Sequence, residues 1–357
     1  MINDKYIEKK LDEIFNNYPQ SKDLQDLYQE MKEDIHESAQ ALLDQGKQPN
    51  PNAAVDQAIK NMGDLAASIK EVDKSKATLS EYKYDVVGIN NINVNVDFDK
   101  VKIVPSPDYF IHISQKQRPK SASYKLQVTK SGADLNVSVP LPSFSLKLIF
   151  SHPHSTVELA LPNSYLGALN LDLKSGSLNI SNVRINGNLK LNLKSGQTKI
   201  EDAEFNNVAS LVVSGSLKLV NVKAANFQSN IRSGTLKLYD VNAKFDVSTH
   251  SGAIRGTQLT GSGKFASNSG AVKLAWQKLT GNVDLSAHSG TIYSVQPNDQ
   301  DFAFKLQAKS GTVKVNHLNT NFEMQAQGAA IGQIGNQDKA QLPLVAATAG
   351  SGVIKLE

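Results

Sequence analysis

A serine-glycine step recurs along the second half of the chain at a spacing close to 19 residues. Strand-forming residues flank each step, and consecutive glycines lie 20, 19, 19, 18, 18, 20 and 21 residues apart. These glycines are Gly176, Gly196, Gly215, Gly234, Gly252, Gly270, Gly290 and Gly311. Self-similarity at this period is typical of a β-solenoid, because a single coil cannot bury its apolar face and must stack on the next. The sequence therefore predicts a mainly β fold, a parallel β-solenoid or β-helix with coils of about 19 residues.

The apolar pattern changes phase at each step, which predicts where the backbone turns. Leucines alternate at positions 189, 191 and 193, whereas Thr198 and Ile200 face inward after the step at Ser195 and Gly196. A period-two strand cannot switch faces without a corner, and glycine reaches positive φ without steric cost. We therefore expect a corner at each step. The step serines are expected to face inward and to bond corner backbone rather than to act as nucleophiles.

The charge distribution divides the chain into an acidic head and a basic body. Residues 1–78 hold 10 Lys+Arg and 15 Asp+Glu, a net charge of −5, and the remainder holds 28 and 19, a net charge of +9. Apolar stripes at helical spacing, such as Ile7, Leu11 and Ile14, predict a small all-α domain over residues 1–72. A polar run predicts a linker over residues 73–82. The β-solenoid then covers residues 83–357 and ends within its last coil.

An uncovered solenoid end would expose strand edges and apolar core, so a cap is expected before the first coil. Residues 83–165 alternate like strands without the short repeat, and they supply a strand-rich N-terminal cap with the first strands. The coils with serine-glycine steps occupy residues 166–357.

No targeting segment is evident at the start of the chain. Residues 1–8 lead directly into a charged amphipathic helix, and no apolar stretch is long enough to span a bilayer. The expected location is the cytoplasm by default, with surface association by a non-classical route as the alternative. The absence of cysteine excludes disulfides, cysteine-ligated zinc and thiol catalysis.

The residue before each step is basic in most coils, and its strand phase points it outward. These basic residues are Lys174, Lys194, Arg232, His250, His288 and Lys309, with Val213 and Asn268 as the exceptions. Stacked coils would align them as a ladder that attracts an anionic polymer, for example a teichoic acid. The alternative is a solvated face whose charges keep the strands soluble. Nucleic acid is the weaker ligand, because stacking aromatic residues are missing from this column.

Neither a metal nor a cofactor is expected. His250 and His288 stand two coils apart, a separation of about 10 Å, which is too far to share a zinc ion. His152 and His154 lie in an expected exposed turn, where no third ligand is near in sequence.

Catalysis is also not expected, although β-helices that cleave polysaccharides are the enzyme class to consider. Such mechanisms need two carboxylates within about 5–10 Å. Asp202 and Asp240 occupy similar phases two coils apart, with Asn221 between them. Asp299 and Asp301 fall in a turn, where aspartate commonly bonds the backbone. The pattern predicts a non-enzymatic protein.

The strand motifs resemble a known family. They are Val-Lys-Ile-Val-Pro-Ser-Pro-Asp-Tyr at 101–109, Val-Glu-Leu-Ala-Leu-Pro at 157–162 and Leu-Asp-Leu-Lys-Ser-Gly-Ser-Leu-Asn-Ile at 171–180. Through them residues 83–357 resemble the bacterial putative-adhesin β-strand-repeat family of unknown function, whose members resemble the β-domains of LiaG- and LiaX-type proteins. That resemblance implies a link to cell-envelope stress responses in Gram-positive bacteria and supplies no catalytic residues.

The head resembles the small helical domain that accompanies bacterial membrane sensor proteins, through Leu-Leu-Asp-Gln-Gly at 42–46 and Met-Gly-Asp-Leu at 62–65. We therefore expect a non-enzymatic binding or scaffold protein of envelope stress sensing or signalling. Residues 1–72 dock a protein partner, a regulator or a membrane sensor, and the solenoid presents a binding face. The alternative is a surface adhesin that binds a wall or host polymer, and a polysaccharide-active β-helix enzyme is the third hypothesis.

Overall fold

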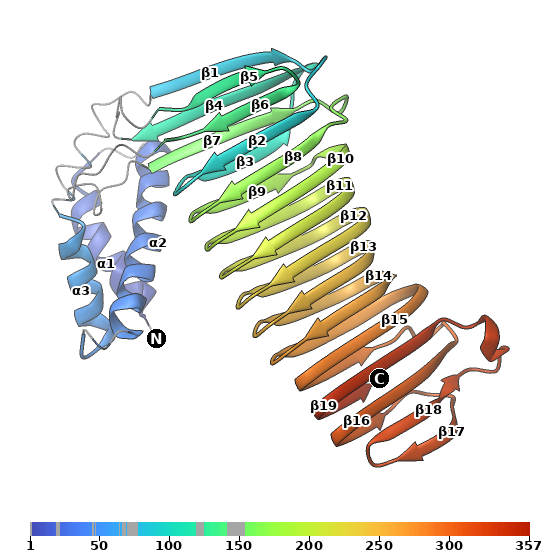
Figure 1. Ribbon diagram of the computed structural model, residues 1–357. Coiled ribbons are helices and arrows are strands. Elements are labelled where there is room, and N and C mark those ends of the chain that lie inside the picture. The colour runs from blue at the N-terminus through green and yellow to red at the C-terminus, as the bar shows by residue number, and fades with distance from the viewer. Residues whose placement is uncertain are drawn as a thin grey trace. The chain divides into compact units, whose positions relative to one another are not determined.

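The computed structural model describes residues 2–18, 22–44, 46, 48–63, 65, 69, 78–118, 125–140 and 154–357. The chain divides into two compact units, one helical and one built of strands (Figure 1). The first comprises residues 1–79, 116–125 and 141–155, and the second comprises residues 80–115, 126–140 and 156–357. Residues 73–77 of the predicted linker lie outside the described residues, and the first strand begins at Thr78, within the range predicted as linker.

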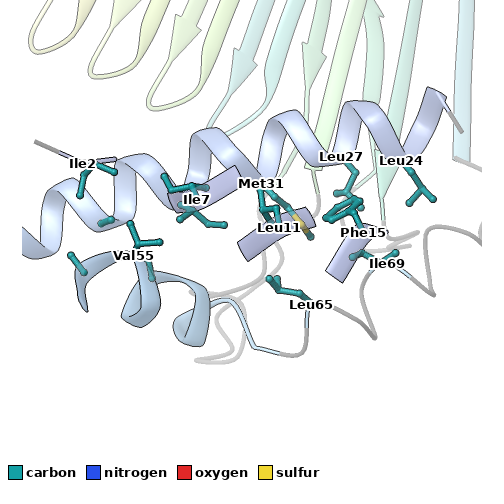
Figure 2. Packing of buried hydrophobic residues seen from close by; sticks show 14 residues of the cluster. Ile2, Ile7, Leu11, Phe15, Leu24, Leu27, Met31, Val55, Leu65 and Ile69 are labelled. Carbon is teal, nitrogen blue, oxygen red and sulfur yellow. The ribbon is translucent and has the colours of Figure 1, made fainter. Parts of the chain in front are cut away.

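The helical unit contains α1 (Asp4–Phe15), α2 (Lys22–Asp44) and α3 (Pro51–Asn61). Asn3 and Asn50 cap α1 and α3, because their side chains accept hydrogen bonds from the backbone N–H groups of Lys5 and Ala53. The predicted apolar stripes meet in one core, shown in Figure 2. The buried side chains are Ile2, Ile7, Leu11, Phe15, Leu24, Leu27, Met31, Ile35, Ala39, Ala54, Val55, Ala58, Leu65 and Ile69.

The predicted solenoid is confirmed in the β unit, where successive coils pair as parallel strands. The coils begin with β8 (Ala168–Leu173), β9 (Ser177–Ser181) and β10 (Arg184–Leu193) and continue with β11 (Gln197–Val212), β12 (Ser216–Ile231), β13 (Thr235–Thr249), β14 (Ala253–Ser267) and β15 (Ala271–Val295). From β11 to β14 each strand starts after one serine-glycine step and ends before the next, so one strand spans one coil. Figure 1 shows these strands stacked in chain order.

The step glycines are required for two different reasons. Gly196 has a φ of +104°, the left-handed corner that the phase change predicts. Gly234 is not among the residues with positive φ, yet a Cβ there would lie 2.4 Å from the carbonyl oxygen of Gly215 in the preceding coil. The backbones of stacked coils therefore approach so closely at this corner that a side chain at the step would clash.

A second corner follows the first five steps, from Gly176 to Gly252, and it contains no glycine. Its residues hold φ angles between 50° and 57° and are Asn182, Asp202, Asn221, Asp240 and Gln258. Asn and Asp adopt this conformation more readily than other residues with a side chain. The coil therefore bends once at the step and again at these residues.

Aromatic rings fill part of the core between β12 and β15. Phe227 and Phe245 are aligned in register, and their ring centroids lie 6.1 Å apart. Phe245 also contacts Phe265 at 5.2 Å and Trp276 at 6.0 Å. Stacked coils thus share one continuous apolar interior.

The C-terminal end departs from chain order. It comprises β16 (Phe302–Val315), β17 (Thr320–Ala326), β18 (Ala329–Ile334), a 3-10 turn (Lys339–Gln341) and β19 (Leu344–Leu356). Strand β19 pairs in parallel with both β15 and β16, and Gly352 stands in register with Gly290 and with Gly311. The expectation that the chain ends within its last coil is therefore wrong, because β19 inserts between two earlier strands. Strands β17 and β18 form an antiparallel pair, and β18 pairs with β16.

The N-terminal end shows the same kind of insertion. Its strands are β1 (Thr78–Asp85), β2 (Asn91–Val96), β3 (Lys100–Pro105), β4 (Phe110–Arg118), β5 (Gln127–Ser131), β6 (Asp134–Ser138) and β7 (His154–Leu161). Strand β2 pairs in parallel with β6 and β8, and β3 pairs with β7 and β9. The earliest coil, formed by β2 and β3, therefore lies between two coils formed by later residues. In this earliest coil the backbone at Asp99 occupies the position that a serine-glycine step occupies in later coils. A Cβ on Gly176 would lie 2.5 Å from the Asp99 carbonyl oxygen.

Candidate functional site

The predicted basic residues before the steps do form a column, which we call the corner ladder (Lys174, Lys194, Arg232, His250, His288 and Lys309). All six side chains are exposed. Backbone hydrogen bonds place them at equivalent positions, since the N–H of Lys194 donates to the carbonyl of Leu173 and that of Arg232 to the carbonyl of Val212. The prediction of an outward-facing column therefore agrees with the geometry.

The corner ladder is interrupted at several coils. Val213 and Asn268 separate its members, as the sequence indicates, and Gly350 of the inserted β19 lies between His288 and Lys309, since a Cβ on Gly350 would lie 2.5 Å from the His288 carbonyl oxygen. Lys174 is also neutralised, because its Nζ lies 2.7 Å from Oδ1 of Asp97. Only the neighbours Lys174 with Lys194 and Arg232 with His250 remain adjacent.

The step serines bond the backbone, as expected, although they do not face inward. The Ser195 hydroxyl donates to the carbonyl oxygen of Lys174 at 3.1 Å, and Ser233 donates to Val213 at 3.1 Å. Ser251, Ser269 and Ser289 repeat the contact in their coils. Most of these side chains are exposed because the step is at a corner rather than within a strand.

The acidic residues considered for catalysis either occupy backbone corners or accept hydrogen bonds from backbone N–H groups. Asp202 and Asp240 occupy the second corner, where their left-handed φ explains their residue type. Asp301 accepts hydrogen bonds from the backbone N–H groups of Asn336 and Gln337, both at 3.2 Å. The Asp301 carboxylate therefore bonds the backbone of residues 336 and 337 rather than the backbone of its own turn.

The histidines are spread over the molecule. Over the described ranges, no group of three or more His, Asp and Glu side chains is arranged to hold a metal ion. His250 contacts the side-chain amide of Asn268 at 3.4 Å. His152 lies outside the described residues, and His154 begins β7, where its side chain is not described.

A second basic column, which sequence reasoning missed, lies on the strand after the steps. This strand column consists of Lys199, Lys218, Lys237, Arg255 and Lys273, each in direct register with the next. All five side chains are exposed. The sequence contains the pattern, because each residue stands third after its step glycine. The predicted ladder was drawn only from the residues before the steps.

Small or uncharged residues flank the strand column on both sides. Alternate residues of a strand share a face, so the neighbours are those two positions before and after each basic residue. Before it stand Gln197, Ser216, Thr235, Ala253 and Ala271, and after it stand Glu201, Val220, Tyr239, Thr257 and Ala275. Glu201 is the sole acid in these two flanking rows.

The charge of the strand column is therefore largely unneutralised. Lys199 forms an ion pair with Glu201, with 2.5 Å between Nζ and Oε2. Within the described part of the chain, the other four basic residues have no ion pair. Because exposed like charges at successive coils lie about 4.8 Å apart, they create a continuous line of positive potential.

Beyond Lys273 the column is no longer uniformly basic. Tyr293 stands third after Gly290, in register with Lys355, which in turn pairs with Lys314. Lys355 forms an ion pair with Glu357, and this contact raises the pKa of the lysine. The unneutralised part of the column therefore lies on β12 to β15.

Two hollows lie on the surface of the described residues. One, of about 370 Å³, lies beside the second corner and includes Glu204 and Lys223. The other, of about 230 Å³, lies in the helical unit beside Phe15 and Tyr28. Burial, with the hydrogen bond to Asp12, raises the pKa of Tyr28 to about 12.

No helix of the described residues is long and apolar enough to cross a membrane.

Several solved structures are similar to the chain over most of its length. A "putative adhesin" from Parabacteroides merdae is 16% identical, with 78% of this chain and 96% of that chain covered and a TM-score of 0.42. A "putative lipid binding protein" from Parabacteroides distasonis is 15% identical, with 78% and 97% covered and a TM-score of 0.45. A "putative adhesin" from Bacteroides fragilis is 14% identical, with 79% and 98% covered and a TM-score of 0.41. No curated protein matches the sequence.

The comparison with protein families covers the β unit. The model of the family described as Toastrack DUF4097 matches residues 89–356, more than half of the chain. That range begins just before β2 and ends with the last residue of β19, so it includes the coils and both inserted ends. The match supports the resemblance to a β-strand-repeat family of unknown function. The chain belongs to the Toastrack DUF4097 family.

Proposed function

We propose that this protein is a non-enzymatic binding protein whose β unit holds an anionic polymer and whose helical unit docks a protein partner. The observation that carries the proposal is the strand column, in which exposed basic residues follow one another in register over five coils. The sheet already holds the backbone of these residues in order, so binding requires no folding of the backbone, which favours retention of a polyanion.

The test of polymer binding uses the full-length protein on an anionic resin. Retention at low ionic strength and release by salt are expected, because bound basic residues displace counterions from a polyanion. Passage through the resin without retention at low salt would overturn the proposal. A variant of the corner ladder, Lys194→Gln with Arg232→Gln, should weaken retention only slightly, because that ladder is interrupted.

The helical unit offers an acidic surface for the proposed protein partner. Glu33 and Glu37 are exposed and stand one turn apart on α2. Crosslinking of the full-length protein in native cells should recover a specific partner, and Glu33→Gln with Glu37→Gln should lower that recovery. Equal recovery with both glutamates replaced would contradict docking through this surface.

The finer proposal is a role in cell-envelope stress signalling, which the resemblance to LiaG- and LiaX-type β-domains supports. The alternative is a surface adhesin that uses the same basic face on a wall or host polymer. Protease added to intact native cells separates the two. Protection of the protein favours docking to an internal regulator, whereas its removal favours the adhesin.

A further inference from the structure

The ligand of the strand column can be specified further from its geometry. Its basic residues form a single file that crosses β11, β12, β13, β14 and β15, the strands that Figure 1 shows stacked along the solenoid. Successive coils are about 4.8 Å apart, so the file extends about 19 Å from Lys199 to Lys273. A matching ligand must therefore be linear and must lie along the solenoid axis, across the strands.

The spacing also limits the charge density of the ligand. To meet every coil, a polymer must carry a charge about every 5 Å along its length, as a chain of closely spaced phosphate groups can. A glycan with one carboxylate per disaccharide spaces its charges more widely and meets fewer of the basic residues. Lysine binds phosphate as a point charge and needs no planar partner geometry, which fits a column with four lysines and one arginine.

The flanking rows favour a backbone without bases. Ser216 and Thr235 are half-buried beside the column, and their hydroxyls can donate to phosphate oxygens. Single-strand nucleic acid sites combine basic residues with several aromatic platforms. In the two flanking rows Tyr239 is the sole aromatic residue. Ala253, Ala271 and other residues with short side chains leave the surface beside the column without bulky groups.

Building on the proposed polymer binding, we infer that the strand column is a site for a linear phosphate polymer that carries no bases and lies along the solenoid axis. Lys218, Lys237 and Arg255 form its centre, because they are consecutive and each is free of an ion pair in the described part of the chain. Lys199 contributes less, since Glu201 already partners it.

The test compares two triple variants of the full-length protein. The column variant carries Lys218→Gln, Lys237→Gln and Arg255→Gln. The control carries Lys190→Gln, Lys223→Gln and Lys264→Gln, which removes three exposed charges from other faces of neighbouring coils. The probe is long-chain inorganic polyphosphate, with binding measured over a range of salt concentrations. Circular dichroism and melting confirm that both variants are folded.

For the column variant, the magnitude of the slope of log K against log salt concentration should fall by about 2, because each of the three lost contacts accounts for about 0.7 of the slope. If affinities converge near 1 M salt, this corresponds to about 100-fold weaker binding near 0.1 M. The control should remain within about 3-fold of the unmodified protein, because long-range charge is screened over about 10 Å. Tripolyphosphate, which is shorter than the column, should bind far more weakly than the long chain.

Different failures have different meanings. Equal losses in the column and control variants would overturn the assigned site while leaving polymer binding in place. Tighter binding of an oligo-dT strand than of polyphosphate of equal charge would overturn the preference for a polymer without bases. Equal affinity for hyaluronan would overturn the phosphate assignment. Absence of binding to every polyanion by the unmodified protein would overturn the proposed function itself.

Discussion

The side-chain amide of Asn221 donates to Oδ1 of Asp202 in the preceding coil at 2.7 Å, and both residues hold a left-handed backbone. This pair explains why Asn and Asp recur at the second corner. They accept positive φ at low cost, and in this pair the side chains also bond from one coil to the next. Asp202 and Asp240, the acidic residues considered for catalysis, therefore have a structural role at the second corner.

Substitution at Asp202 tests this explanation. Asp202→Asn should change the free energy of unfolding by less than about 0.5 kcal/mol, because Asn suits the same φ. Asp202→Val should lower it by about 1–2 kcal/mol, because a β-branched residue is strained there. Urea denaturation measures both. Asp246→Val, at an exposed strand position, is the control, and an equal loss in the two valine variants would contradict the corner role.

Replacement of Gly196 tests the first corner. The new Cβ of Gly196→Ala would lie 2.1 Å from the Gly176 carbonyl oxygen, at a φ of +104°. We expect a loss of about 2–4 kcal/mol, from left-handed strain together with overpacking. Thermal melting provides the readout. Gly281→Ala is the matched control, since its Cβ would meet Ser262 at 3.3 Å without positive φ, and comparable destabilisation of both would argue against the corner geometry.

Removal of the Phe245 ring tests the core. Phe245→Ala should lower the free energy of unfolding by about 3–5 kcal/mol, because the ring is buried between Phe265 and Trp276. Since Trp276 is the single tryptophan of the chain, its fluorescence emission should also shift to longer wavelength. Tyr239→Ala in the same strand, where the side chain is 49% exposed, should cost far less. An unchanged emission spectrum would indicate that the two rings do not pack together.

Acid should weaken the N-terminal end of the β unit through Asp108. Hydrogen bonds from His112, Lys83 and the backbone N–H of Phe110 hold the pKa of this carboxyl well below its usual range. Because the folded pKa is depressed, the carboxylate stabilises the fold above the unfolded pKa near 4, and this contribution is lost as the pH falls below that value. Melting temperature measured against pH should show a shallower acid decline for Asp108→Asn. Identical acid profiles would show that Asp108 contributes nothing.

The regular part of the fold was predictable because its signal is local. The spacing of the steps predicts the coils, and the phase change beside Ser195 predicts the corner. The same locality explains what was missed. Every step has nearly the same sequence, so nothing near Gly352 indicates that it belongs between Gly290 and Gly311, and only long-range pairing decides this order. The second corner was missed because Asp202 and Asp240 were considered only as possible catalytic groups, although Asn and Asp also favour a left-handed backbone.

The candidate site was only partly predictable. The corner ladder follows from the residue before each step, but its interruption by Gly350 depends on the inserted strand. The strand column was readable from Lys218 and Lys237, third after their glycines, once that position was compared across coils. Neutralisation of Lys174 by Asp97 involves a strand 77 residues earlier, and a sequence pattern cannot show that contact.

The insertion of β19 also has a consequence for synthesis of the protein. From β8 to β15 the coils can add in the order in which they leave the ribosome, each on the edge of the one before. Strand β16 emerges next, yet its partner on that side is the segment Leu344–Leu356 at the end of the chain. Nascent protein therefore carries two open strand edges until residues 344–356 have been synthesised, and this interval is when pairing with another chain competes most strongly with native closure.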